Sequence, residues 1–302
     1  MPSSQKQLTG GAVMTQAAAK TGVGPTVMVA IEQHFPKDQR ITEDDLANLI
    51  LPFGMRAFVW LMRLGPARDW MVRESEKTIP GIWGGLACRK RYIDEKMVES
   101  VGRIDAVVNL GAGFDTRAFR LPALAGIPVW EVNQPENIEP KRARMQKLLG
   151  ELPAHITLVP TDFDHEELGT VLASHGYSED KRTFFIWEAV TQYLTEAGVR
   201  KTFDFLAKSV SGSRLSFTYI RRDFLDGQTM YGQEATYEKY VVKDKTWLFG
   251  MDPEGVADLL GRYGWHVVEH LGYEELVERY VKPTGRELAF TPIERMVYAE
   301  KV

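Results

Sequence analysis

The most informative segment of the chain reads Ala106-Val107-Val108-Asn109-Leu110-Gly111-Ala112-Gly113-Phe114-Asp115-Thr116-Arg117. An apolar run that leads into glycines and then into a helical pattern predicts a buried strand, a turn and a helix. Gly111 and Gly113 allow the backbone to approach a ligand closely. Open α/β sheets bind their ligands at the carboxyl ends of strands. The segment therefore predicts a ligand site in an α/β fold.

The spacing of the turn distinguishes between two kinds of ligand. A dinucleotide fingerprint has a third glycine three residues after the second, where this chain has Thr116. The carboxylate of Asp115 would also repel a phosphate at a helix N-terminus. The turn therefore favours a nucleoside with a cationic or zwitterionic arm, such as S-adenosylmethionine (SAM), over a nicotinamide dinucleotide.

Residues 108–117 resemble the first motif of the leucine carboxyl methyltransferase-like family of SAM-dependent O-methyltransferases, in its bacterial branch acting on small or polyketide-like molecules. Four further segments fit in the same order, over roughly residues 80–300, and the first 40 residues carry none of the resemblance. It implies a Rossmann-like class I methyltransferase sheet of about seven mostly parallel strands, with SAM as cofactor. In the first motif it assigns cofactor contacts to Gly111, Ala112, Gly113, Asp115 and Arg117.

Alternating strand and helix patterns after residue 104 favour the same architecture. The strand candidates are Ala106–Leu110, Pro128–Val132, Ile156–Val159, Thr183–Trp187, Leu215–Ile220, His266–Glu269 and a last one near Arg295–Ala299. We expect residues 1–22 to be a mobile N-terminal segment, 23–100 a helical cap and 101–302 the methyltransferase domain. Residues 221–251, rich in tyrosine, follow the fifth strand, and we expect this insertion to form a lid over the ligand crevice.

Composition excludes several classes of protein. The 302 residues carry a net charge of −4, which argues against a nucleic-acid partner. The single Cys88 excludes an internal disulfide and a cysteine-rich zinc site, and the six histidines form no metal constellation. The most apolar segment, Leu46–Leu64, is interrupted by Pro52, Arg56 and Arg63, which predicts an amphipathic cap helix rather than a membrane anchor. We therefore expect a cytoplasmic protein with no metal and no membrane partner, and the oligomeric state stays open.

Acidic residues follow the second and third strands. Glu131 lies where a carboxylate accepts hydrogen bonds from both ribose hydroxyls, and its alternative role is that of a solvated strand-end acid. The resemblance groups Val132 with it at the cofactor. It also assigns to Asp162 the adenine amino group and to Phe163 the cover of the adenine ring.

Glu188 ends the fourth strand, after an apolar run in which a carboxylate requires a partner. The ammonium group of the SAM methionine arm would be a suitable partner. The family pattern here is similar to Glu-Gly-x-x-x-Tyr-Leu, so Ala189 replaces a usual glycine. Tyr193 would then line the methyl-transfer pocket, with packing in the core as its alternative role.

Arg89 lies in a segment that resembles the family's Arg-Thr-Arg-x-x-Asp motif, with Lys90 in place of threonine. The resemblance implies that the planar fork of Arg89 binds the SAM carboxylate, whereas its alternative is a basic surface turn. Cys88 beside it is either a thiol of low pKa or, as we favour, a packing residue.

Two further departures from the family pattern follow the second strand. Asn133 replaces the usual second acid, and Pro140 lies where an apolar helical residue is expected. A proline there is tolerated only in the first turn of the following helix. With Ala189, these departures leave open a catalytically silent SAM-binding or interaction protein.

The expected reaction is methyl transfer from SAM to an oxygen of a small or medium-sized acceptor. A carboxylate acceptor is already ionised at neutral pH, so positioning and desolvation suffice. We expect Arg222, with Arg221 beside it, to hold an anionic acceptor, although a solvated basic pair is an equal alternative. With Tyr193, Arg222 is our candidate catalytic residue. A nicotinamide-dependent oxidoreductase is the less favoured enzyme class.

Overall fold

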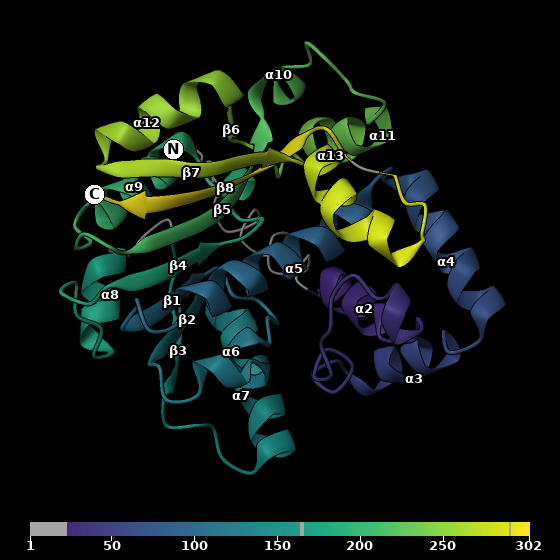
Figure 1. Cartoon of the computed structure of the whole chain (residues 1–302), viewed down its shortest axis with the longest axis horizontal. Coiled ribbons are helices and arrows are strands. Elements are labelled where there is room, and N and C mark those ends of the chain that lie inside the picture. Colours follow the sequence, from purple (N-terminus) through teal and green to yellow (C-terminus); the bar gives the residue numbers. More distant parts are fainter. Residues whose placement is uncertain (1–22, 164–165, 290) are drawn as a thin grey trace, which may run out of the picture.

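The protein is described here from a computed structural model that covers residues 23–163, 166–289 and 291–302. The expected mobile segment, residues 1–22, lies outside the described residues. An eight-stranded sheet in the order β3-β2-β1-β4-β5-β8-β7 forms the centre, and β6 pairs with β5 (Figure 1). The strands are β1 Ala106–Leu110, β2 Val129–Asn133, β3 Ile156–Pro160, β4 Thr183–Trp187, β5 Arg214–Arg221, β6 Gly250–Met251, β7 Trp265–Gly272 and β8 Glu294–Lys301.

Helices cover both faces of this sheet, and a further group packs beside it (Figure 1). The α-helices are α2 Val23–Glu32, α3 Phe53–Leu61, α4 Gly65–Thr78, α5 Ile82–Ser100, α6 Arg117–Arg120, α7 Pro135–Leu149, α8 Leu168–Ser174, α9 Glu196–Ala207, α10 Arg222–Leu225, α11 Glu234–Tyr237, α12 Val256–Arg262 and α13 Tyr273–Leu276. Short 3₁₀ and π segments include η3 Thr191–Tyr193, η4 Glu238–Lys243 and η6 Val277–Val281.

The α/β class and the mostly parallel sheet are confirmed. β1 to β6 pair in parallel, whereas β8 runs antiparallel to both β5 and β7. All seven predicted strands are present, and their ends differ by a few residues at most. The two-residue strand β6 was not predicted, because so short a segment carries no periodicity.

Alternation along the buried strands divides the core into two layers. Val108 on β1 and Phe185 on β4 join the cluster that α8, α9 and α12 cover. Their neighbours Val107 and Phe184 join the cluster that α5, α6 and α7 cover. Successive side chains of a strand point to opposite faces, so two apolar faces explain the near-continuous apolar runs in the sequence.

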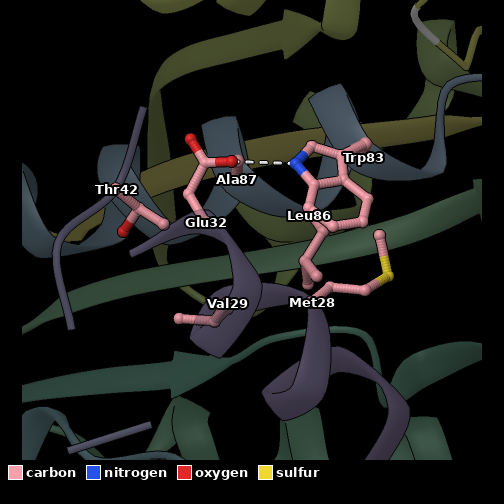
Figure 2. A pocket seen from close by; sticks show the side chains of 7 residues that line it. All are labelled: Met28, Val29, Glu32, Thr42, Trp83, Leu86 and Ala87. Atoms are coloured by element: carbon pink, nitrogen blue, oxygen red, sulfur yellow. Dashed lines mark hydrogen bonds between the residues drawn. The ribbon is translucent and has the colours of Figure 1, made fainter. Parts of the chain in front are cut away.

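The helical cap packs through a core of its own, drawn from α2, α3, α4 and the start of α5. Glu32 is buried there and accepts hydrogen bonds from the Trp83 indole (2.8 Å), the Ile41 amide (2.8 Å) and the Arg286 guanidinium (2.6 Å). Figure 2 shows Glu32 and Trp83 on the wall of a small hollow between α2 and α5. Both carboxylate oxygens of Glu32 have hydrogen-bond partners. We therefore assign this hollow a structural role, at the contact between α2 and α5.

The insertion after β5 contains α10, α11 and η4, and its last residues return to the sheet. The Leu248 amide donates to the Gln192 carbonyl at 2.6 Å, which fastens the insertion to η3 at the carboxyl end of β4. Within the insertion, the rings of Tyr240 and Trp247 stack 4.7 Å apart. Whether the insertion moves as a lid stays a prediction.

The expectation for Pro140 was wrong. Pro135 begins α7, so Pro140 is its sixth residue and lies inside the helix, not in the first turn. Proline has no amide hydrogen, so the carbonyl of Glu136, which is an exposed residue, loses its helical donor there.

Candidate functional site

The glycine turn between β1 and α6 is held by the neighbouring strand. The amides of Gly111 and Ala112 both donate to the Val132 carbonyl at the end of β2, at 2.8 and 3.0 Å. Gly111 has φ of 77°, and a Cβ there would lie 2.3 Å from a methyl group of Val190. The tight turn therefore requires glycine at position 111. Val132, a predicted cofactor residue, holds the turn through its main-chain carbonyl oxygen.

Five charged side chains meet beside this turn: Arg89, Lys90, Asp115, Arg117 and Glu188. We call them the charge cluster. Glu188 accepts hydrogen bonds from Arg89 Nε (2.8 Å), Lys90 Nζ (3.2 Å) and Arg117 Nη1 (2.7 Å). Asp115 contacts Arg117 and, at 3.3 Å, Lys90. The structure thus brings four sequence-predicted residues together, with Lys90 between the two acids.

Burial would raise the pKa of both acids in the charge cluster, yet both are held below their usual range. Lys90, Arg117 and Arg89 lower the pKa of Glu188, and Arg117 and Lys90 lower that of Asp115. The two carboxylates are therefore ionised at neutral pH. A pair of buried anions is a suitable site for an organic cation.

Arg89 lies deeper than a surface turn would place it. Its Nη1 donates to both oxygens of Glu294 on β8 at 3.0 and 2.9 Å, while its Nε meets Glu188. The alternative interpretation of a basic surface turn is therefore wrong. Burial also raises the pKa of the Cys88 thiol to about 12, which excludes a reactive thiol of low pKa.

Glu131 is fully buried at the end of β2, and its partner is Lys141 on α7. Lys141 Nζ lies 2.6 Å from Glu131 Oε2, but the angles do not make a hydrogen bond. Among the described residues no hydrogen-bond donor reaches the other oxygen, Oε1. Burial raises the pKa of Glu131 to about 7, against the opposing effect of Lys141. A carboxylate oxygen accepts more than one hydrogen bond, so the unpaired Oε1, and Oε2 beside Lys141, can both receive hydroxyl donors.

The remaining cofactor candidates follow β3. Asp162 and Phe163 are half-buried. The Asp162 amide donates to Glu166 Oε2 at 2.8 Å and the Glu166 amide donates to the Asp162 carbonyl at 2.9 Å, which closes the loop. The Thr161 amide donates to the Asn133 carbonyl, so this loop lies beside the end of β2. Asn133 Oδ1 accepts from the Gln134 amide at 2.7 Å and from Asn137 Nδ2 at 3.2 Å, a role that needs no negative charge.

The structure separates the two arginines after β5. Arg221 pairs with Asp223 at 2.9 Å, inside the insertion. Arg222 lies over the ring of Phe249 at 5.7 Å, and no ion pair of the described residues includes it. Tyr193 is half-buried in η3, which follows β4. Because β4 and β5 pair in parallel, Tyr193 and Arg222 both follow strands at the carboxyl edge of the sheet.

Three residues of the site were missed from the sequence: Asp44, Lys141 and Glu294. Asp44, in the segment between α2 and α3, accepts from Thr116 Oγ1 at 2.6 Å and so joins the cap to the glycine turn. None of the three belongs to a motif with local spacing. Lys141 was the easiest of the three to find from the sequence, because it is a cation on the helix expected to follow Glu131.

Within the described part of the chain, no group of histidine, cysteine and acidic residues has the arrangement of a metal site. No helix in that part is both long and apolar enough to cross a membrane.

Comparison with known proteins identifies relatives of the chain. A sequence model described as leucine carboxyl methyltransferase matches residues 22–207. A putative SAM-dependent methyltransferase of Mycobacterium avium is 25% identical over 95% of this chain and 96% of its own length. Another, from Mycobacterium bovis, is 30% identical over 66% of this chain and 67% of its own length. The matched region begins at residue 22, so the expectation that the first 40 residues carry no resemblance was wrong.

Solved structures share the fold. A putative methyltransferase from Thermobifida fusca superposes with a TM-score of 0.54 over 78% of this chain and 88% of its own, at 14% identity. A DUF574 family protein from Streptomyces avermitilis superposes with a TM-score of 0.52 over 78% of this chain and 91% of its own, at 11% sequence identity.

The Glu131–Lys141 pair predicts a pH-dependent loss of stability in Lys141→Met. A raised pKa means that the free energy of unfolding falls as Glu131 ionises with rising pH, and Lys141 opposes that fall. At about pH 8 the variant should lose roughly 3–5 kcal/mol, because it leaves a buried charge unpaired. At about pH 5, where Glu131 is protonated, the loss should be much smaller. Urea unfolding measures both.

Lys147→Met, which replaces an exposed lysine on the same helix, is the control. Its free energy of unfolding should equal that of the unchanged protein at both pH values. An equal loss for Lys141→Met at both pH values would contradict the coupling.

Ala189 predicts a stabilising substitution. Its φ of 55° lies in the left-handed region, which costs an L-residue roughly 1–2 kcal/mol. Ala189→Gly should therefore raise the free energy of unfolding by up to about 1 kcal/mol, after allowing for the freedom of glycine in the unfolded chain. Ala173→Gly, on the exposed side of α8, should lower it by about 1 kcal/mol. Destabilisation by both changes would show that position 189 is unstrained.

Proposed function

Because the chain belongs to the leucine carboxyl methyltransferase family, whose members use SAM, we propose that it transfers the methyl group of SAM to a carboxylate oxygen of a small or medium-sized acceptor. The charge cluster is the observation that supports this proposal most directly. Its two buried, ionised acids lie beside a glycine turn at the carboxyl end of β1. Such a site discriminates in favour of a cationic nucleoside and against a dinucleotide phosphate.

The residues present fit the cofactor. Glu131 offers Oε1, which has no donor among the described residues, to a ribose hydroxyl, while Oε2 is paired with Lys141, and the φ of 47° at Gly113 gives a left-handed turn with space beyond it. We propose that Arg89 binds the SAM carboxylate and that Asp115 and Glu188 face its ammonium group. Asp162 and Phe163 would hold the adenine. Bound SAM supplies an electrophilic methyl group. The nicotinamide alternative does not hold for this family.

A carboxylate acceptor fits the residues expected at the acceptor end of the site, which include a cation but no evident general base. An ionised carboxylate needs no general base, so the chain has only to position it, exclude water and neutralise its charge before transfer. Arg222, which has no ion-pair partner among the described residues, has its positive charge available for that purpose. We propose that Arg222 orients the acceptor and that Tyr193 lines the pocket, with residues 221–251 as the lid.

The direct test is incubation with methyl-labelled SAM and a panel of matched carboxylic acids and phenols, after calorimetric titration with SAM. We expect SAM binding and a base-labile methyl ester from the acids. Transfer to phenols alone would overturn the carboxylate assignment. SAM binding with no transfer to any acceptor would favour the silent binding protein.

Lys90 predicts a gain of cofactor affinity on substitution. Its ammonium group lies between Asp115 and Glu188, where the SAM ammonium is proposed to lie. Lys90→Thr restores the family's usual residue and removes one ammonium group from between the two acids, which keep Arg117 and, at Glu188, Arg89 as partners, so SAM should bind about tenfold more tightly, the value of one charge-assisted contact. Calorimetry measures the affinity. Arg91→Thr, which removes an exposed pair with Glu95 on the same helix, should leave it unchanged. Weaker binding by Lys90→Thr would show that Lys90 supports the ligand.

The two arginines after β5 form a matched pair for the acceptor. Arg222→Gln should raise KM for an anionic acceptor about 10- to 100-fold, as expected for the loss of a charge-assisted hydrogen bond, with the SAM affinity unchanged. Arg221→Gln should leave KM nearly unchanged, because Arg221 is already paired with Asp223. The reverse ranking, from initial rates, would assign the acceptor to Arg221.

A further inference from the structure

Helix α3 is apolar and yet is almost entirely exposed. Of its nine residues only Val59 is buried. Phe53 is 85% exposed and Trp60 61%, and Leu64, just after the helix, is 60% exposed. Val59 and Met62 pack into the cap core, and the His34 ring is hydrogen-bonded to the Val59 carbonyl at 3.0 Å. The expected amphipathic cap helix therefore exists, but its larger apolar face is turned to solvent.

The exposed residues form one continuous stripe. Phe53, Ala57, Trp60 and Leu61 are separated by three and four positions, so they share one face of α3. Figure 1 shows α3 beyond α2, at the margin of the helical group that lies beside the sheet. Monomeric proteins seldom expose so many large apolar side chains together unless the surface binds something.

The segment that carries the stripe has only basic charges, although the exposed acids Asp45 and Asp69 border it at its two ends. Residues 46–68 contain Arg56, Arg63 and Arg68 and no acid, in a chain whose net charge is −4. Arg56 on α3 and Arg63 in the turn that follows the helix are both exposed. The next residue along, Asp69, lies 3.6 Å from Arg68 and so is already paired.

We propose that this face of α3 docks on an anionic lipid surface. Phe53, Trp60 and Leu64 would enter the interfacial layer, and Arg56 and Arg63 would meet the lipid phosphates. An exposed apolar stripe with tryptophan and phenylalanine, bordered by arginine, is the arrangement of helices that lie in the plane of a membrane interface. The proposal revises the expectation that the protein has no membrane partner, and it is independent of the proposed methyl transfer.

Charge favours a lipid surface over two other occupants of this face, a second copy of the chain and the N-terminal residues 1–22. A second copy docked symmetrically on the same face would bring two cationic surfaces together, and residues 46–68 offer no acid to pair with the arginines. Residues 1–22 contain Lys6 and Lys20 and no acid, so they offer the arginines no counter-charge. An anionic surface alone matches both the apolar stripe and its cationic border.

The test is co-sedimentation of the full chain with vesicles. Phosphatidylcholine vesicles that contain phosphatidylglycerol should bind the protein, pure phosphatidylcholine vesicles should bind it weakly, and salt should weaken the binding. Arg56→Gln with Arg63→Gln should reduce the binding constant about 30-fold, at the usual contribution per cation near an anionic surface. Phe53→Ser with Trp60→Ser should abolish sedimentation.

Two controls match these changes elsewhere on the surface. Val268→Ser removes an exposed apolar side chain on β7, and Arg200→Gln with Arg262→Gln removes two exposed cations. Both should bind vesicles as the unchanged protein does. Thermal unfolding and SAM titration show that each variant is folded.

Two outcomes would overturn the proposal. One is an equal or absent response to both kinds of vesicle. The other is a dimer that Phe53→Ser with Trp60→Ser converts to a monomer in the absence of lipid, which would assign the face to a second copy of the chain.

Discussion

Two buried carboxylates at the ends of the paired strands β1 and β4 organise this molecule. Asp115 and Glu188 are brought together because those strands are neighbours in parallel register. Neither acid is tolerable in a dry interior without cations. Arg89 and Lys90 therefore bring the long helix α5 against the sheet edge, and Arg117 brings α6. The position of α5, on which the cap rests, follows from this neutralisation.

The same charges that hold the fold are those proposed to meet the cofactor. Arg89 divides its guanidinium between Glu188 and Glu294, and Lys90 divides its ammonium between two acids. A ligand that carries both an ammonium and a carboxylate replaces such pairs with equivalent ones, so its binding leaves few charges unpaired. Binding at this site is therefore an exchange of ion pairs, and its strength depends on how well the resident pairs are made.

The cap performs two separate tasks. Through Asp44 and Thr116 it touches the glycine turn, and through Glu32 and Trp83 it is locked to α5. Its outer helix, α3, takes little part in either contact and presents apolar side chains outward. The inner surface of the cap thus lies against the proposed cofactor site, whereas the outer surface is the one proposed to dock. An enzyme held at a lipid surface would meet apolar acids where they are most concentrated.

The sequence by itself determined the strands, their alternation with helices and the glycine turn, because periodicity and turn chemistry are local properties. Residues inside motifs, such as Arg89, Asp115 and Glu188, were identified for the same reason. Other features depended on the tertiary structure. The 205 positions between Arg89 and Glu294 carry no local signal of their contact. The pairing of Lys141 with Glu131, the separation of Arg221 from Arg222 and the outward face of α3 were likewise decided by the packing of distant elements, since burial and charge pairing are properties of the assembled chain.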